Sequence, residues 1–433
     1  MKRKIHLYML HFVHLLNQKS RMKTEIISIG DELLIGQTIN TNASWMGQEL
    51  AKIGIKNNRT ITISDTEEEI HEALKGAESY ADLILITGGL GPTKDDITKK
   101  VLCDYFDTEL ELNQEVLTDI QAYFKLRNKP FLETNNMQAM LPKACTVLRN
   151  SMGTASGMWF ERNGKVFVSM PGVPYEMKHL METGVFPKVK ETFQLQELAH
   201  RTILTHGIGE SFLAEIIMDW ENRLRESNLE MAYLPSPGLV KLRVTSNTGD
   251  TNKVNLFCDE LYQIIPEYIF GEGTITMEET LANLLLEKNA TISLAESCTG
   301  GYASHLLTKI PGSSSFYEGS IICYSYDIKE KELNVPKSVL LNKGAVSQEV
   351  VEILSEEIRK KYNTDYSISI SGIAGPSGGT EDKPVGTVWI SARSKEKVVS
   401  KKFNFGNNRE RNISQSAVAG FNLLRKLILM EEK

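Results

Sequence analysis

Thr291-Ile-Ser-Leu-Ala-Glu-Ser-Cys-Thr-Gly-Gly301 is the stretch around which this chain is organised. It opens with a short run of β-branched and apolar residues, which predicts a buried strand, and it breaks at Glu296. The pattern over 302–309 then predicts a helix. A strand–turn–helix of this kind can present a nucleophile above a sheet edge, and its helix N-terminus offers free N–H groups to an anion. The alternative is an ordinary turn in which a Ser or Thr caps the helix.

Ser297 needs a base to act as a nucleophile, and the sequence offers it a lysine more readily than a histidine. After residue 206 the only histidine is His305, which would lie about 8–12 Å along the helix axis and point away. A lysine with a lowered pKa is another common base for serine. Tyr324 and Lys329 fall where the next apolar strand, predicted over 319–324, would end beside the first. A Ser–Lys–Tyr arrangement is therefore available, although tyrosines and lysines at strand ends are usually solvated.

Three motifs in the second half of the chain resemble the CinA family. They are Leu-Ala-Glu-Ser-Cys-Thr-Gly-Gly (294–301), the segment of Tyr324 and Lys329, and Ser371-Gly-Ile-Ala-Gly-Pro-Ser-Gly-Gly379 followed by Lys383-Pro-Val-Gly-Thr-Val388. They are similar to the C-terminal nicotinamide-nucleotide amidase domain of that family. The resemblance extends over essentially the whole chain from Met22, with the motifs in the family's order.

The resemblance implies a hydrolase that converts nicotinamide mononucleotide to nicotinate mononucleotide and ammonia, without a metal or cofactor at this site. Ser297 would attack the amide carbonyl, Lys329 would take its proton, and Tyr324 would orient or relay. Backbone N–H groups around residues 299–301 would stabilise the oxyanion. The substrate-binding residues that the resemblance implies are Thr299, Gly300, Gly301, Gly372, Gly375, Gly378, Gly379, Thr380 and Arg409.

One of these residues stands where the chain departs from the family. The family usually has Gly-Asp-Arg where this chain has Gly406-Asn-Asn-Arg409, with an extra residue and no aspartate. Arg409 as a phosphate ligand is therefore the weakest of the residues carried over.

Length and composition bound the remaining possibilities. A chain of 433 residues predicts two or three domains. The net charge of −6 argues against a nucleic-acid-binding surface spread over the whole protein, so no direct nucleic-acid partner is expected. The five cysteines are scattered without a Cys-x-x-Cys pair, which favours reduced thiols in a cytoplasm over disulfides or a zinc site. No run reaches the roughly 18 apolar residues of a membrane span.

Residues 1–21 begin with basic and then apolar residues, as a signal peptide does. Histidines interrupt the apolar run, and no small-residue cleavage site follows. We interpret this segment as a disordered or wrongly assigned extension, which leaves open whether translation starts at Met1 or Met22.

From Met22 the pattern alternates between strand and helix. Strands are predicted over 24–29, 55–63 and 83–87, and helices over 43–52, with Asn42 as a plausible cap, and 66–78. Such alternation predicts an α/β domain with a parallel sheet and helices on both faces. Ligands in these sheets sit at the carboxyl ends of the strands, where Asp31, Glu32 and the loop Gly88–Asp96 fall.

The loop Gly88–Asp96 has neither the Gly-Lys-Ser/Thr ending of a P-loop nor a dinucleotide fingerprint. It resembles the molybdopterin-binding-like domain at the CinA N-terminus, which the family associates with metal-dependent hydrolysis of ADP-ribose. The resemblance implies a nucleotide site and a divalent metal of unknown identity. The residues implied are Asp31, Glu32, Gly88, Gly89, Gly91 and Thr93 for the nucleotide, and Asp95 and Asp96 for the metal. A glycine-rich turn in which Asp95 or Asp96 caps a helix is the alternative.

The chain is thus predicted to hold three domains after its first 21 residues. Residues 22–185 form the molybdopterin-binding-like domain and 274–433 the α/β amidase domain. Between them, 186–273 follow a split β-α-β-β-α-β order. This middle unit has no catalytic cluster, which favours a spacer or dimerisation module. A homodimer is expected. The rival interpretation of the whole chain is a nucleotide-binding regulatory or competence-associated protein without turnover.

Overall fold

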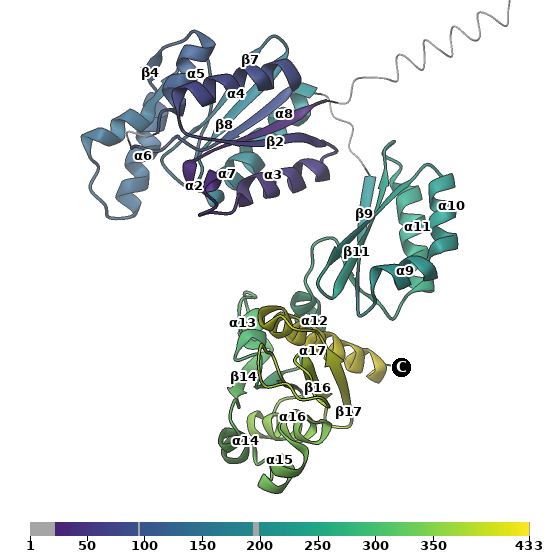
Figure 1. The fold of residues 1–433 in the computed structure, drawn as a ribbon. Coiled ribbons are helices and arrows are strands. Elements are labelled where there is room, and N and C mark those ends of the chain that lie inside the picture. The colour runs from purple at the N-terminus through teal and green to yellow at the C-terminus, as the bar shows by residue number, and fades with distance from the viewer. Residues whose placement is uncertain (1–21, 94–95, 194–198, 433) are drawn as a thin grey trace, which may run out of the picture. The chain divides into compact units, whose positions relative to one another are not determined.

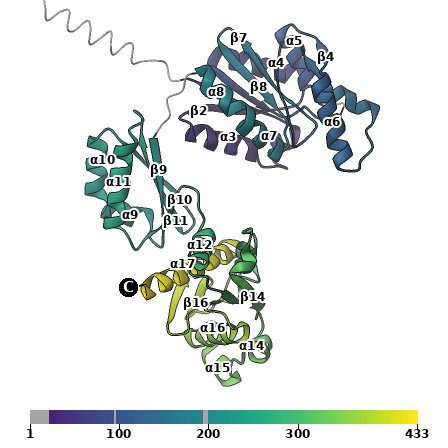
Figure 2. The same ribbon diagram turned by 180° about the vertical axis from the view of Figure 1, so that it is seen from behind.

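The computed structural model describes residues 22–93, 96–193 and 199–432, so the segment 1–21 lies outside it. The chain divides into two compact units, one up to residue 198 and one from Ala199 onward. Figures 1 and 2 show the fold from two opposite sides. No helix within the described ranges is long and apolar enough to cross a membrane.

The first unit is built on a six-stranded sheet in the order β2-β1-β3-β8-β7-β6. The first four strands are parallel, β7 runs antiparallel to β8, and β6 runs antiparallel to β7. The sheet is mixed and not wholly parallel as predicted. The two-residue turn Asn163-Gly164, with φ of 54° and 73°, joins β7 to β8 as a hairpin. The strands are β1 Thr24–Ile29, β2 Asn57–Ile63, β3 Leu83–Thr87, β6 Thr146–Leu148, β7 Gly157–Arg162 and β8 Lys165–Met170.

Helices cover both faces of this sheet, as the strand pattern predicts. Successive residues of β3 face opposite sides, so Ile84 packs into one hydrophobic cluster and Leu85 into another. The first cluster includes residues of α4, α5 and α6, and the second includes residues of α3, α7 and α8. These helices are α3 Thr41–Lys52, α4 Glu67–Tyr80, α5 Thr98–Phe106, α6 Gln114–Leu126, α7 Pro174–Leu180 and α8 Phe186–Phe193.

The predicted cap of the first long helix is wrong by two residues. Asn40, not Asn42, caps α3, because its side chain accepts from Ala43 N at 3.0 Å. Asn42 instead donates to Gly172 O at 2.7 Å and to Thr87 Oγ1 at 3.3 Å. Its side chain thereby ties α3 to the end of β3 and to the turn after β8.

The second unit begins with a four-stranded antiparallel sheet in the order β10-β11-β9-β12. The β-α-β-β-α-β order is as predicted, except that the first helix is divided at Ile217. The elements are β9 Ala199–His206, α9 Glu210–Ile216, α10 Met218–Glu226, β10 Glu230–Ser236, β11 Leu239–Ser246, α11 Thr251–Ile264 and β12 Ile269–Glu272.

The remainder of this unit is a five-stranded mixed sheet in the order β14-β13-β15-β16-β17. The first three strands are parallel, β16 runs antiparallel to β15, and β17 runs antiparallel to β16. The strands are β13 Ile292–Glu296, β14 Tyr317–Ile322, β15 Tyr366–Gly372, β16 Thr387–Arg393 and β17 Val398–Asn404. One face packs against α12 Met277–Glu287, α13 Tyr302–Thr308 and α17 Arg409–Glu431, and the other against α14 Tyr326–Leu333, α15 Lys337–Lys343 and α16 Gln348–Tyr362.

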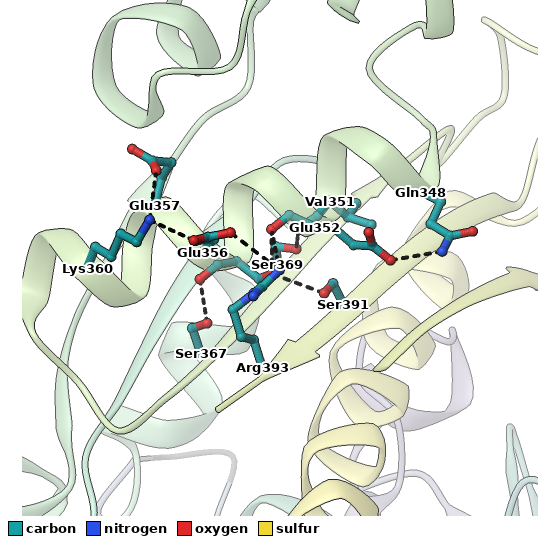
Figure 3. A network of polar contacts seen from close by, with 11 residues as sticks. Gln348, Val351, Glu352, Glu356, Glu357, Lys360, Ser367, Ser369, Ser391 and Arg393 are labelled. Carbon is teal, nitrogen blue, oxygen red and sulfur yellow. Dashed lines mark hydrogen bonds and ion pairs between the residues drawn. The ribbon is translucent and has the colours of Figure 1, made fainter. Parts of the chain in front are cut away.

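The central strand β15 alternates serine and isoleucine, yet both of its faces are buried. Ile368 and Ile370 face the core formed with α17. The serine face meets α16, where Ser367 Oγ donates to Ser355 O at 2.6 Å and Ser369 Oγ to Val351 O at 2.5 Å (Figure 3). Because each hydroxyl finds a backbone acceptor, the strand can be buried without an unsatisfied polar group. This central strand then leads into the loop that begins at Gly372.

Candidate active site

Ser297 and Lys329 meet at the carboxyl edge of the second unit's larger sheet. Ser297 directly follows β13, and Lys329 lies on α14, where it is fully buried. Lys329 Nζ lies 3.0 Å from Ser297 Oγ. The two residues converge because β13 and β14 are parallel neighbours, which confirms the predicted strand pairing. The predicted position of Lys329 at a strand end is wrong, since Ser325 caps a helix that carries the lysine on its second turn.

The burial of Lys329 makes its uncharged amine more accessible than it is for a lysine in water. Burial lowers the pKa of Lys329. Its Nζ also donates to Cys323 O at 2.5 Å and to Tyr324 O at 3.3 Å. When Lys329 is uncharged, it has two hydrogens and one lone pair, so the two carbonyls can accept the hydrogens while the lone pair accepts from the Ser297 hydroxyl. This is the arrangement that a general base requires.

Cys298, next to the candidate nucleophile, is part of the hydrophobic core. Only 6 % of the residue is exposed, and it packs in the cluster formed with α12, α13 and α17. Burial raises the pKa of the Cys298 thiol to about 12. Because the thiolate is the reactive form, this cysteine is a poor nucleophile at neutral pH.

Glu296 is a residue of the site that sequence reasoning missed. It is fully buried, and its carboxylate accepts from Gly301 N at 3.0 Å, Ala303 N at 3.2 Å and Ser304 N at 2.9 Å. The N-terminus of α13 is therefore filled by a side chain of the protein, and the expectation that it is open to an anion is wrong. The available signal was an acidic residue between a buried strand and a helix start, where a carboxylate satisfies free N–H groups.

The same contacts restrict which backbone groups of the turn can stabilise an oxyanion. Gly300 N donates to Ser297 O at 3.2 Å, and Gly301 N is held by Glu296. Ser297 N donates to Ile370 O at 2.9 Å. Within the described part of the turn, the N–H groups of Cys298 and Thr299 have no backbone acceptor, and that of Cys298 lies against its own thiol. The expected set of donors over 299–301 is thus narrowed, because both glycine N–H groups are already engaged.

Gly300 and Gly301 contribute their backbone conformation instead. Their φ angles are 58° and 98°, in the left-handed region that glycine adopts at little cost. Together with Thr299 they line an open pocket of about 850 Å³ between α13 and the start of α17. Thr299 is 4 % exposed, and its Oγ1 has no hydrogen-bond partner.

Tyr324 and Arg409 come together beside the Ser–Lys pair. Arg409, the first residue of α17, donates from Nη1 to Gly375 O at 2.7 Å, and its Nη2 lies 3.4 Å from the Tyr324 hydroxyl. Tyr324 is 61 % exposed. Its hydroxyl thus faces the guanidinium, and only its backbone carbonyl contacts Lys329 Nζ. The chain's extra residue before Arg409 does not prevent the arginine from reaching the loop after β15.

The loop after β15 contains the remaining predicted glycines. A side chain at Gly375 would come within 2.4 Å of Val385 Cγ1, and one at Gly379 within 2.7 Å of Val385 N. Gly372 ends β15, Gly378 has a φ of 90°, and Thr380 Oγ1 accepts from Lys383 N at 3.1 Å. Only Gly375 of this set contacts Arg409. The glycines are thus explained by close packing of the loop against its own returning segment.

Asn412 is a second residue that the sequence did not indicate. It is 1 % exposed on the first turn of α17. Its Nδ2 donates to Ala374 O at 3.0 Å and to Gly406 O at 2.9 Å. One buried amide therefore holds the loop of Gly375 and the loop before Arg409 together.

In the first unit, the predicted glycine loop packs tightly onto its own domain. A side chain at Gly88 would come within 2.2 Å of Ile29 O, one at Gly89 within 2.1 Å of Thr98 Oγ1, and one at Gly91 within 2.5 Å of Asp96 Oδ2. Close packing against β1, α5 and Asp96 therefore explains why these three positions are glycine.

The predicted carboxylates of this unit use only some of their oxygens in hydrogen bonds to the rest of the chain. Asp31 Oδ1 accepts from Ser64 Oγ at 2.6 Å, and Asp96 Oδ2 accepts from Thr93 N at 2.9 Å. Asp95 lies outside the described residues. The Glu32 carboxylate folds back over Gly30. The described residues contain no group of three or more His, Cys, Asp or Glu that could hold a metal, so Asp96, with one oxygen free, contributes at most part of a metal site.

Glu176 is a further acidic residue at this sheet edge, on the helix that follows β8. It is 7 % exposed, and burial raises the pKa of its carboxyl group. Asn150 Nδ2 donates to it at 2.7 Å. A buried carboxyl with a raised pKa at the ends of parallel strands is typical of a functional site.

Three family models match consecutive parts of the chain. The probable molybdopterin binding domain matches 25–191, the damage-inducible protein CinA KH domain matches 200–272, and the CinA C-terminal domain matches 274–428. KH domains hold nucleic-acid backbones with a Gly-x-x-Gly loop. No Gly-x-x-Gly sequence occurs in residues 200–272 of this chain.

Curated relatives match over nearly their whole length. A CinA-like protein from Cytophaga hutchinsonii is 46 % identical over 93 % of this chain and 97 % of its own, and one from Flavobacterium psychrophilum is 42 % identical over 94 % and 99 %. Solved structures of a CinA superfamily protein from Klebsiella pneumoniae and of CinA from Thermoplasma acidophilum are 27 % and 31 % identical. They cover 36 % and 40 % of this chain and 96 % and 98 % of theirs, each with a TM-score of 0.35. The chain belongs to the CinA family.

Proposed function

We propose that the C-terminal domain hydrolyses nicotinamide mononucleotide to nicotinate mononucleotide and ammonia. The observation that carries this proposal is the buried amine of Lys329, 3.0 Å from the hydroxyl of Ser297. A serine with a lysine base is one solution to amide hydrolysis. The family's link between this domain and deamidation of the nucleotide supports the choice of substrate.

The proposed reaction has two halves. Ser297 Oγ attacks the carboxamide carbon while its proton passes to Lys329 Nζ. The N–H groups of Cys298 and Thr299 stabilise the tetrahedral oxyanion. As the C–N bond breaks, Lys329 returns the proton to the leaving nitrogen and ammonia departs. Water then attacks the acyl-serine ester with Lys329 again as base, which releases the carboxylate product and regenerates Ser297.

We propose that the nucleotide's phosphate lies near Arg409. This guanidinium stands at the N-terminus of α17, a helix of 23 residues, where the macrodipole also favours an anion. Its Nη1 contact with Gly375 O and the neighbouring Tyr324 hydroxyl hold it at the site edge. In this proposal Tyr324 orients Arg409, and its hydroxyl does not relay the proton of Ser297.

Ammonia release separates this proposal from a nucleotide-binding regulator. The purified full chain, incubated with nicotinamide mononucleotide, should release ammonia over many turnovers. Binding of the nucleotide without ammonia release would contradict the enzymatic proposal and favour the regulator.

Glu296→Gln should lower kcat of deamidation by about 10–100-fold with little change in KM. The substitution should shift the turn that carries Ser297, and a misplaced nucleophile slows the reaction more than it weakens substrate binding. A glutamine would place an NH₂ group against backbone N–H donors that the carboxylate now satisfies. The matched control is Glu278→Gln, because Glu278 on α12 is also buried, at 8 % exposed. Steady-state kinetics and thermal unfolding of both variants check this. Equal losses of activity in the two variants would show that Glu296 has no specific effect on the turn.

We further propose that the first unit hydrolyses ADP-ribose with a divalent metal. Asp31, Glu32 and the loop of Asp96 follow the parallel strands β1 and β3 at the edge where such sheets bind ligands. Asp96 would supply one carboxylate ligand to the metal, and Asp95, beside it in the sequence, would supply a second. When bound, a divalent cation would polarise the pyrophosphate.

Asp96→Ala should impair ADP-ribose hydrolysis by about 10²-fold and leave deamidation nearly unchanged, because the two sites belong to different compact units. EDTA should have the same selective effect. Both activities are measured on the same preparation. Loss of both in a folded Asp96→Ala protein would indicate one shared site, and unchanged ADP-ribose hydrolysis would exclude Asp96 as a ligand.

A further inference from the structure

Arg425 is a buried cation without a counter-ion. It lies on α17, and only 7 % of the residue is exposed. Its Nε donates to Asn422 Oδ1 at 3.1 Å, and the described residues place no carboxylate in an ion pair with its guanidinium. A buried charge is costly unless it is paired and hydrogen-bonded. Within the described residues neither Nη group of Arg425 makes a hydrogen bond, so their four hydrogens are available for a partner.

The orientation of Arg425 is fixed from one side only. The Nδ2 of Asn422 lies 2.9 Å from His206 Nδ1 at the end of β9. An amide NH₂ can only donate, so the imidazole accepts and is neutral, in agreement with the burial that lowers the pKa of His206 to about 4. The amide oxygen is thereby turned toward Arg425 Nε, and the far end of the guanidinium is left uncommitted.

A pocket of about 330 Å³ lies beside Arg425. It is formed by β12 together with α12 and α17 of the same unit. Phe270, Leu284 and Leu429 give it an apolar lining, and Thr280 and Asn283 add polar groups. Ligand pockets range from about 300 to 1,000 Å³, so this one suits a small molecule.

The charges around the pocket favour an anion at the Arg425 end. Two glutamates also line the pocket, but both oxygens of Glu272 are engaged. Arg201 donates to its Oε1 and Oε2 at 2.5 and 2.9 Å, and Tyr262 to its Oε1 at 2.7 Å. Glu287 is exposed on the last turn of α12. Lys401 and Lys426 add further positive charge near His206 and Arg425, and these three cations contribute to the lowered pKa of His206.

We propose that the pocket beside Arg425 binds a small organic anion whose phosphate or carboxylate group pairs with the guanidinium. The planar guanidinium presents its hydrogens in a fork that matches either oxyanion. The apolar lining takes the rest of the molecule. Because the pocket joins β12 to α12 and α17, the anion links the antiparallel sheet to the helices that cover the catalytic sheet. This site is separate from Ser297 and does not depend on the proposed deamidation.

Thermal unfolding of the full chain with phenyl phosphate or benzoate tests this site, one probe for each kind of oxyanion. At ten times the dissociation constant, the better probe should raise the unfolding midpoint by about 3–5 °C. Arg425→Met should lose this rise. The Met variant should fold, because an apolar side chain of similar length replaces an unpaired buried cation. Arg411→Met, on the exposed side of the same helix, is the matched control and should keep the rise.

Phenyl phosphate could also bind at the proposed catalytic site, near Arg409. Arg409→Met separates the two sites, and this variant should keep the rise in unfolding midpoint. Three outcomes would each overturn the proposal. They are loss of the rise in Arg409→Met, full retention of the rise in Arg425→Met, and no rise with either probe in the unmodified chain. Arg425→Lys provides a second test by calorimetry, since it keeps the charge and loses the fork. Binding should weaken about tenfold, and unchanged binding would exclude recognition by the guanidinium.

Discussion

Ser297→Ala should reduce kcat of nicotinamide mononucleotide deamidation by about 10³-fold or more, because the covalent route disappears with the attacking oxygen. Cys298→Ala should keep most of the activity. The thiol is intrinsically the better nucleophile, but it is buried in the core and its pKa is raised to about 12. Ammonia release under saturating substrate measures both variants.

Activity of Ser297→Ala and Cys298→Ala can also contradict the assignment of the nucleophile. Cys298→Ala removes a small core side chain, so a modest loss of stability is expected and should be measured by thermal unfolding alongside activity. If Ser297→Ala stays active while a thiol reagent inhibits the unmodified chain and spares Cys298→Ala, then the nucleophile is the cysteine.

Lys329→Arg should lower kcat by about 10²–10⁴-fold while the nucleotide still binds, because arginine keeps the positive charge but cannot accept a proton near neutrality. In the unmodified protein, deamidation should rise with pH through an apparent pKa below the usual 10.5 of lysine, since burial lowers the pKa of Lys329. Steady-state pH profiles measure this rise. A near-normal kcat in Lys329→Arg, with damage confined to KM, would make the lysine a phosphate anchor instead of a base.

Stability gives a readout of Lys329 that does not depend on turnover. The folded-state pKa of this lysine is lower than its unfolded value, so between the two pKa values the unfolded chain binds more protons. The free energy of unfolding should therefore gain a contribution that grows as pH rises through this window. Lys329→Met should lack that contribution, and denaturant unfolding at several pH values would detect the difference. An identical pH dependence in Lys329→Met would mean that the folded-state pKa is not lowered.

The sequence by itself determined the order of elements and the identity of the central pair. The β-branched run before Ser297 and the apolar run before Tyr324 predict two strands, and the pairing of β13 with β14 confirms their proximity. The lack of a histidine in reach of Ser297 pointed to a lysine. The two strand predictions succeed because local hydrophobic periodicity records which residues must be buried, and parallel strands bring their carboxyl ends to one edge.

Tertiary structure decided which groups are already engaged. Glu296 fills the N-terminus of α13, Asn412 joins two loops, and the Tyr324 hydroxyl faces Arg409 instead of the Ser–Lys pair. Lys329 lies on a helix instead of a strand end, and its lowered pKa comes from burial. The unpaired charge of Arg425 is equally invisible in the chain, where an arginine near a helix end indicates a solvated cation. Desolvation and hydrogen-bond pairing depend on residues distant in sequence, and these two effects set the chemistry of the site.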